Sequence, residues 1–270
     1  MDYDPVKDKF GGMIDGKYWP TRIFFALLQL FFLRAWYVRR AIHSVLKGRE
    51  GSIRMLDAGT GFGQFAYWVA KKYSKVRIHA VDIKPTYLER AKVFSQLAGM
   101  DTRVTYSLDD LTRLQASGPY DLVLSVDVME HIEEDERAFQ HFFRVLRSGG
   151  HVIINTPSDQ GGSDVSNEGD TGFIGEHVRD GYSVEEITRK LTGAGFVIDD
   201  ISFGYGLFGR MAWKISIKWP MIMLNKHFVL GLLLPFYYVV FLPLALILNT
   251  LDISSKNDTG TGLTVVAHRP

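Results

Sequence analysis

Residues 56–66 read LDAGTGFGQFA, and this short stretch decides the fold class. An apolar strand (residues 53–58) ends at Asp57, glycines follow at positions 59, 61 and 63, and a helix begins near Gly63. Glycine lets the backbone turn sharply and approach a ligand at the N-terminus of a helix. A dinucleotide site of the G-x-G-x-x-G type needs glycine at position 64, where this chain has Gln64. The spacing G-x-G-x-G therefore indicates a ligand-binding turn and disfavours a dinucleotide site.

Strands and helices alternate beyond this stretch. Further strands are predicted at 76–83, 103–108, 120–128, 151–157, 196–204 and 262–270, and helices at 63–73, after Pro85, at 133–147 and at 182–196. Gly149 and Gly150 are expected to end the helix 133–147, and Ser183 with Glu186 forms a capping box for the last helix. This alternation predicts an α/β fold with a doubly wound, seven-stranded, mostly parallel sheet.

Acidic residues stand at or just after the ends of three predicted strands. Asp57 ends the first, Asp82 ends the second 25 residues later, and Asp109 follows the third, with Asp110 beside it. The carboxyl ends of parallel strands meet at one rim of the sheet, where ligands of such sheets bind. A carboxylate at the position of Asp82 can accept hydrogen bonds from both hydroxyls of a ribose. The three acids together predict a nucleoside-binding rim.

Over residues 53–204 and 262–270 the chain resembles the class I S-adenosylmethionine-dependent methyltransferases. The resemblance implies a Rossmann-like methyltransferase fold with S-adenosyl-L-methionine as cofactor. In that family the first acid lies near the methionine amine, the residue after the ribose acid packs on the adenine, and the third acid, here Asp109, serves the adenine amine. The cofactor residues implied for this chain are Asp57, Gly59, Thr60, Gly61, Gly63, Asp82, Ile83, Asp109, Asp110, Leu111 and Asp127.

The segment SVDVMEHIEED (residues 125–135) follows the fourth strand and resembles the family's segment that faces the transferred methyl group. Asp127, Glu130 and His131 are its polar candidates. Methylation of an oxygen needs a general base near the acceptor hydroxyl, and histidine suits this work near neutral pH. His131 and Asp127 are therefore predicted to be catalytic. The alternative is that Glu130 and His131 only shape the start of the next helix.

A polar loop of 24 residues follows the fifth strand and is long enough to suggest a functional lid. At its end, His177 and Tyr182 are predicted to be catalytic and, together with Arg179, to contact the acceptor. The alternative is that Arg179 and Asp180 are solvated loop charges.

The predicted site contains no metal, but a metal remains an alternative. Some ubiquinone-pathway O-methyltransferases and small-RNA 3′-end methyltransferases use a Glu-His pair in the segment after the fourth strand as metal ligands. Glu130 and His131 form such a pair here, and Asp127 and His177 would complete the ligand set.

The charge distribution indicates a membrane surface as partner. Residues 20–49 hold six Lys and Arg and no acid, and residues 205–256 hold five against one acid, although the net charge is only +1. Basic residues beside apolar and aromatic ones suit an anionic membrane surface. The acidic remainder of the chain makes nucleic acid an unexpected partner, and chance clustering is the plain alternative. The chain has no cysteine, which excludes disulfides and thiolate metal sites.

Two segments are predicted to meet the membrane. Residues 20–47 form one long helix with an 11-residue apolar run, too short to span a bilayer, and with Trp19, Trp36 and Tyr37 as interface anchors. Its alternative is a helix packed against the core. Residues 228–248 carry no charge for 21 positions, roughly the ~20 needed to cross a hydrocarbon core.

The position of this run between the last two strands argues against a single crossing, because both of its ends must return to one sheet. Pro235 and Pro243, with Gly231, are expected to break the run into pieces too short to span. A bent, re-entrant or interfacial element is therefore predicted, preceded by a basic amphipathic helix with Arg210, Lys214 and Lys218 on one face. A soluble cap over the site is the alternative.

These observations predict three parts: an N-terminal helical segment (1–50), a catalytic domain (51–204 plus 259–270) and a hydrophobic insertion (205–258). The expected function is that of a monotopic methyltransferase acting on a lipid, an isoprenoid quinone or a lipid-linked saccharide, with oxygen the favoured acceptor atom. The start MDYDPVKDKF lacks a basic, apolar leader, so the cytoplasmic face of the membrane is expected.

Three other functions stay open. One is a soluble methyltransferase with a hydrophobic cap. A second is a nucleic-acid methyltransferase, which the lack of an N/D-P-P-Y tetrad disfavours, and a third is a non-catalytic binding module, which the intact acids disfavour.

Overall fold

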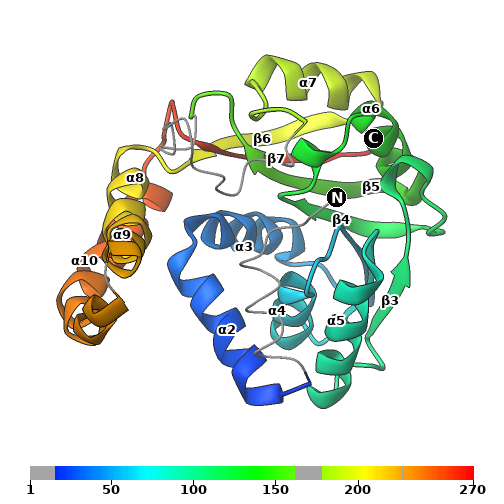
Figure 1. Ribbon diagram of the computed structural model, residues 1–270. Helices are drawn as coiled ribbons and strands as arrows, with labels where there is room; N and C mark the ends of the chain where they lie inside the picture. Colours follow the sequence, from blue (N-terminus) through cyan, green and yellow to red (C-terminus); the bar gives the residue numbers. More distant parts are fainter. Residues whose placement is uncertain (1–15, 162–177, 227) are drawn as a thin grey trace.

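The computed structural model describes residues 16–161, 178–226 and 228–270. Its centre is a seven-stranded sheet in the order β3-β2-β1-β4-β5-β7-β6, in which β7 runs antiparallel to both of its neighbours (Figure 1). This confirms the predicted doubly wound sheet. The strands are β1 Ile53–Ala58, β2 Val76–Asp82, β3 Val104–Leu108, β4 Tyr120–Val126, β5 Leu146–Pro157, β6 Val197–Gly204 and β7 Gly262–His268.

Helices cover both faces of the sheet (Figure 1). On one face, α3 and α4 bury residues such as Val38, Ile42 and Val69 against the strands. On the other face, α6 and α7 bury Phe139 and Leu191 among others. Strands with a largely buried, apolar middle between two helical layers, as in β4, are the pattern of buried parallel sheets. The helices outside the insertion are α2 Tyr18–Phe31, α3 Leu33–Leu46, α4 Gln64–Lys72, α5 Pro85–Leu97, α6 Asp135–Val145 and α7 Val184–Gly193, with short 3₁₀ turns η1 Leu111–Arg113 and η2 Met129–His131.

The prediction of one long N-terminal helix is wrong. The chain forms two helices, α2 and α3, that meet at 89° at Phe32, whose backbone is extended. The bend has a packing cause, because the two helices bury their apolar sides against different partners. Phe25 of α2 packs against Phe94 of α5, whereas α3 lies on the sheet. Sequence periodicity predicts which residues are buried, but it does not predict the elements against which they pack.

The predicted end of the helix 133–147 is also wrong. Helix α6 stops at Val145 and β5 begins at Leu146, which pairs with Tyr120 of β4. Gly149 and Gly150 therefore lie within β5 rather than at the helix end. Pairing with a neighbouring strand decides this boundary.

Between β6 and β7 the chain builds a helical arm, defined here as residues 207–254, that projects from the body (Figure 1). The register pairs Gly204 with Gly262, so the arm leaves and returns at one point of the sheet. The outgoing half is helical throughout its described length, although a π-helical turn interrupts the predicted basic amphipathic helix. The elements of the arm are α8 Leu207–Trp213, η3 Lys214–Lys218, α9 Trp219–Lys226, η4 Phe228–Leu233 and α10 Leu234–Ser254.

The prediction that prolines break the apolar run is wrong. Pro235 lies in the first turn of α10, where its missing N–H costs nothing, and Pro243 lies inside a continuous helix. Residues Leu230–Ser254 are long and apolar enough to cross a membrane by length and composition, and little of this helix is buried inside the protein. Helices α2 and α3, taken together as one bent segment, are also long and apolar enough to cross a membrane.

A buried carboxylate joins the arm to the body. Asp252 of α10 is fully buried and accepts hydrogen bonds from the Tyr37 hydroxyl of α3 (2.9 Å) and from the Gly209 N–H of α8 (2.8 Å). Asn257 donates to the same carboxylate at 3.3 Å. Three separate segments therefore meet on one side chain, which holds the root of the arm in place.

The substitution Asp252→Ala should destabilise the protein, because it leaves the Gly209 N–H buried without its acceptor and removes one of the hydrogen bonds of the Tyr37 hydroxyl. We expect a loss of about 3 kcal/mol in the free energy of unfolding, measured by urea titration. The exposed Asp258→Ala is the control and should change it by less than about 0.5 kcal/mol. Equal losses in the two variants would contradict the role given to Asp252.

Candidate active site

The glycine turn lies at the carboxyl rim of the sheet, against the segment that follows β4. Gly59 has φ +81°, and a Cβ there would stand 2.3 Å from a methyl carbon of Val128. Gly63 has φ +80° and is the N-cap residue of α4. Glycine is required at the first position because two backbone segments approach closely, and at the second because L side chains rarely adopt this conformation.

Asp57 sits beneath this turn. Its side chain is buried, and its carboxylate accepts a hydrogen bond of 2.6 Å from the Thr60 hydroxyl. Burial raises the pKa of Asp57 to about 6; the hydrogen bond from Thr60 opposes this shift and the nearby Asp82 adds to it. A carboxylate that still ionises at neutral pH suits an ammonium group, in agreement with the role that the resemblance implies.

Asp82 ends β2 and is tied to the turn. Its carboxylate accepts hydrogen bonds from the Gly61 N–H (2.8 Å) and the Lys84 N–H (2.9 Å). The next residue, Ile83, is 63% exposed, and Leu108, which pairs with Asp82 in the sheet, is 61% exposed. An acid flanked by two exposed apolar side chains fits a ribose beside an adenine ring. Sequence reasoning missed Leu108, although an apolar residue at the end of a strand next to an acid was a usable signal.

The structure gives Asp109 another role than the predicted contact with adenine. Its carboxylate is buried and accepts hydrogen bonds from the backbone N–H groups of Gln115 and Ala116. Asp110 caps η1 by accepting from Thr112. The two acids therefore hold the loop after β3. The side chain of Leu111 is buried in the hydrophobic core, and its contact with the cofactor stays a prediction.

Two buried polar atoms near the rim have no hydrogen-bond partner among the described residues, which is the state expected of groups that bind a ligand. One is Oε1 of Gln64, the first residue of α4 after the glycine turn. The other is Oγ of Ser125 in β4, two residues before Asp127. Together with the close-packed Gly59, these atoms fit a polar ligand such as the predicted S-adenosylmethionine.

Asp127, predicted to be catalytic, forms an ion pair with Arg34 from the first turn of α3. The side chains of the two residues keep 28% and 34% of their surface exposed. The backbone N–H of Arg34 donates to the hydroxyl of Tyr205, which follows β6 at the root of the arm (3.2 Å). Sequence reasoning missed Arg34 and Tyr205, because nothing in their local pattern reveals a contact across the fold.

Glu130 and His131 point in different directions. Glu130 is buried, and its carboxyl accepts a hydrogen bond of 3.1 Å from the Thr156 hydroxyl. Burial, and to a smaller extent the charge of Asp127, raise the pKa of Glu130 to about 8. His131 is exposed at the end of η2, and whether it meets an acceptor stays a prediction.

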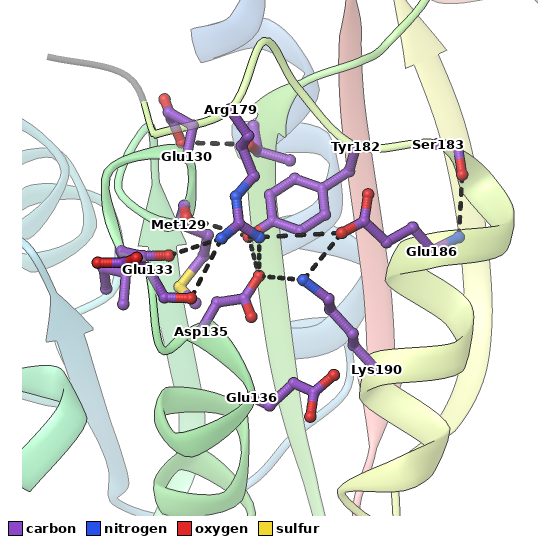
Figure 2. Close-up of polar contacts among 12 residues, drawn as sticks. Met129, Glu130, Glu133, Asp135, Glu136, Arg179, Tyr182, Ser183, Glu186 and Lys190 are labelled. Atoms are coloured by element: carbon purple, nitrogen blue, oxygen red, sulfur yellow. Dashed lines mark hydrogen bonds and ion pairs between the residues drawn. The ribbon is translucent and has the colours of Figure 1, made fainter.

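Tyr182, predicted to contact the acceptor, is fully buried between α6 and α7 (Figure 2). Its hydroxyl donates to Asp135 (2.5 Å), and Asp135 also forms ion pairs with Arg179 and with Lys190. Figure 2 shows these side chains converging on the Asp135 carboxylate. The polar groups of Tyr182 and Arg179 therefore hold the α6–α7 layer together, and their role in reading the acceptor stays a prediction.

The metal alternative gains no support from the described residues. His177 lies outside them, as does most of the predicted lid. Within the parts of the chain that the structure describes, no group of three or more histidine, aspartate or glutamate side chains is arranged to hold a metal ion.

A cavity of about 580 Å³ lies at the opposite end of the strands from the rim, where β4 and β5 begin. Its three arginines already have partners: Arg144 donates to the Leu114 carbonyl, Arg269 to the Leu146 carbonyl, and Arg147 forms an ion pair with Asp121. Because the cavity lies where these strands begin, it is remote from the acids and glycines at their carboxyl ends.

The buried carboxyl of Glu130 should make stability depend on pH. Its pKa rises from an ordinary 4.5 to about 8 on folding, so its contribution is full below about pH 4.5 and is lost as the pH rises toward 8. Relative to Glu130→Gln, the free energy of unfolding of the native protein should fall by up to about 1.4 kcal/mol per pH unit in this window. Urea titrations at several pH values measure it, and parallel curves would contradict the buried neutral carboxyl.

Comparison with known proteins agrees with this geometry. Residues 55–150 match the family model described as a methyltransferase domain. Ajmaline N-methyltransferase of Rauvolfia serpentina is 33% identical over 101 residues, covering 37% of this chain and 34% of that protein. The mitochondrial ubiquinone biosynthesis O-methyltransferase of Candida albicans is 26% identical over 130 residues, covering 48% of this chain and 38% of that protein. The chain thus spans about a third of the length of the curated relatives it matches.

A solved structure shares the fold over almost the whole chain. It is phosphoethanolamine N-methyltransferase 2 of Haemonchus contortus in complex with S-adenosyl-L-methionine, with a TM-score of 0.60, 22% identity, and coverage of 97% of this chain and 60% of that one. The sheet order, the glycine turn with its acids and the matched family model lead to one conclusion. Residues 55–150 carry a methyltransferase domain, and the sheet around them has the Rossmann-like fold of the class I S-adenosylmethionine-dependent methyltransferases.

Proposed function

We propose that the protein transfers a methyl group from S-adenosylmethionine to an apolar acceptor held at a membrane. The observation that carries the proposal is the position of the apolar arm, whose root, at Tyr205 and Gly206, lies beside Asp127 at the same rim as the cofactor residues. An acceptor that partitions into a bilayer would reach the rim along this arm.

Different rim residues would bind different parts of the cofactor. Asp82 would hold the ribose hydroxyls, Ile83 and Leu108 would flank the adenine, and Asp57 would face the methionine ammonium group. The cofactor supplies a methyl group already activated by its sulfonium charge. The remaining task of the protein is to align the acceptor and, for an oxygen acceptor, to remove a proton.

The surface of the arm supports a membrane-held acceptor. Phe236 and Val239 of α10 are 74% and 76% exposed, and the helix presents Val240, Leu244 and Ile247 to the outside as well. Helix α2 adds a second apolar stripe with Trp19, Ile23 and Leu27, and Arg22 lies 5.0 Å from the ring of Trp19. Exposed apolar area of this extent, beside cations, is typical of a membrane-binding surface.

The length of the arm sets how deep it can reach. Residues 230–254 as a helix measure roughly 37 Å, more than the ~30 Å of a hydrocarbon core. Both ends of the arm return to one sheet edge, so we propose a monotopic arrangement on the cytoplasmic face. Lipids, isoprenoid quinones and lipid-linked saccharides are the acceptor classes that this arrangement fits. That the relatives named above include an N- and an O-methyltransferase agrees with a common cofactor half and variable acceptor surroundings.

Asp82→Ala tests the cofactor site. Loss of two hydrogen bonds from ribose hydroxyls to a carboxylate should weaken S-adenosylmethionine binding by at least tenfold, roughly 1.4 kcal/mol or more. Isothermal titration calorimetry measures the affinity, and Asp101→Ala, an exposed acid away from the rim, is the control. An unchanged affinity in the Asp82 variant would remove Asp82 from the site.

Methyl transfer and membrane binding test the acceptor. Protein incubated with isotope-labelled S-adenosylmethionine and a total lipid extract should place the label in the lipid phase, read by mass spectrometry. Flotation with vesicles of phosphatidylcholine and phosphatidylglycerol should carry the native protein upward. The double variant Phe236→Asp, Val240→Asp should stay behind, whereas Val197→Asp, at the far end of β6, should float. Label confined to water-soluble products, or equal flotation of all variants, would contradict a membrane-held acceptor.

A further inference from the structure

Two residues other than glycine adopt left-handed backbone conformations within the described parts of the chain, and both contact the same arginine. Asp127 has φ +52° and Tyr205 has φ +56°. Arg34 forms an ion pair with the carboxylate of Asp127 and donates its backbone N–H to the hydroxyl of Tyr205. Such conformations cost free energy and persist where surrounding contacts enforce them, often at functional sites. Arg34 supplies these contacts.

Arg34 comes from the elbow between α2 and α3, which also contacts the arm. The guanidinium group lies 4.8 Å from the centre of the Phe32 ring, at the bend itself. The preceding residue, Phe31, packs edge-on against Tyr238 of α10 at 5.4 Å. Within four residues the chain therefore runs from the apolar surface of the arm to the carboxylate that follows β4.

Among the residues that the structure describes, the polar groups named here around Arg34 carry almost no net charge at neutral pH. The charge of Arg34 is balanced by Asp127. Glu130, with a pKa near 8, is mostly protonated, and the Tyr205 hydroxyl is neutral. The Asp127 carboxylate would repel a fatty carboxylate, and the Arg34 guanidinium would repel an amine. Neither group repels a neutral hydroxyl, which can donate to Asp127 and accept from its neighbours.

On the basis of the proposed function, we propose that Arg34 is a positioning residue: it holds the Asp127 carboxylate as hydrogen-bond and proton acceptor for a neutral hydroxyl group on the apolar acceptor. The proposed acceptors are thereby narrowed to alcohols or phenols that carry no charged group next to the oxygen that is methylated.

The transfer step balances with these groups. A C–O bond forms as the C–S bond of the sulfonium breaks, and S-adenosylhomocysteine leaves as a neutral thioether. The acceptor oxygen becomes positively charged as it takes the methyl group, so its proton becomes strongly acidic. The Asp127 carboxylate takes that proton, although Arg34 stays charged beside it, and later releases it to water.

Binding of matched probes tests the proposal without turnover. Decanol, decanoate and decylamine, below their aggregation concentrations, are titrated at pH 7 into full-length protein saturated with S-adenosylhomocysteine. The native protein should bind decanol most tightly. Arg34→Gln leaves Asp127 without its cation, so preference should shift roughly tenfold toward decylamine, whereas Asp127→Asn should shift it roughly tenfold toward decanoate.

Two variants separate this role from a general loss of structure. Arg34→Lys keeps the charge and should retain the native preference for decanol. Arg189→Gln, an exposed arginine of α7, should behave like the native protein. A native preference for decanoate or decylamine, or head-group preferences unaltered in both the Arg34→Gln and the Asp127→Asn variants, would overturn the proposal.

The same proteins separate this inference from the proposed function. The native protein could bind the cofactor and show the predicted head-group preferences but transfer no methyl group to lipid. That result would refute the membrane-held acceptor and leave the role of the Arg34–Asp127 pair intact. If transfer to lipid occurs but Arg34→Gln keeps both the native kcat and the native preference for decanol, Arg34 has no positioning role and the proposed function stands.

Discussion

The antiparallel pairing of β6 with β7 is the constraint on which the rest of the site depends. Gly204 lies opposite Gly262, and Gly260 approaches the Gly204 carbonyl so closely that a Cβ would stand 2.3 Å from it. Any segment inserted between these strands must therefore begin and end at one point of the carboxyl rim. That point is next to the residues that follow β4, so the arm rises beside Asp127 rather than elsewhere on the surface.

Opposite charges and burial keep a crowded acidic rim compatible with folding. Asp57 and Asp82 each accept hydrogen bonds from groups of the glycine turn, which offsets part of the cost of burying them. Asp127 is neutralised by Arg34, and Glu130 takes up a proton near neutral pH. The cofactor half of the rim thus stays acidic, which suits a cationic ligand, and the half next to the arm is close to neutral.

Much of this arrangement followed from local sequence. Asp57, Gly59 and Asp82 lie where their motifs place them, because a strand, a tight turn and a helix are local structures and parallel strands bring their ends together. The features that local sequence did not reveal have a common cause. Leu111 and Tyr182 stood near motif residues, yet their side chains point into the core, and only packing decides which side of a loop or helix is buried. The 89° elbow at Phe32 contains neither proline nor glycine, and Pro243 does not break its helix, since tertiary contacts outweigh local propensity in both places.

The sequence by itself determined the sheet, the ligand rim and the cofactor class, because each depends on residues close together in the chain and on the regular geometry of strands and helices. Tertiary structure alone decided which side chains from distant segments share the acceptor side of the rim. Arg34, Asp127 and Tyr205 are separated by 171 positions at the widest, and no periodicity connects them. They meet because α3 packs on the sheet, the helix elbow turns its first residues toward β4, and the β6–β7 register returns the arm to the same place.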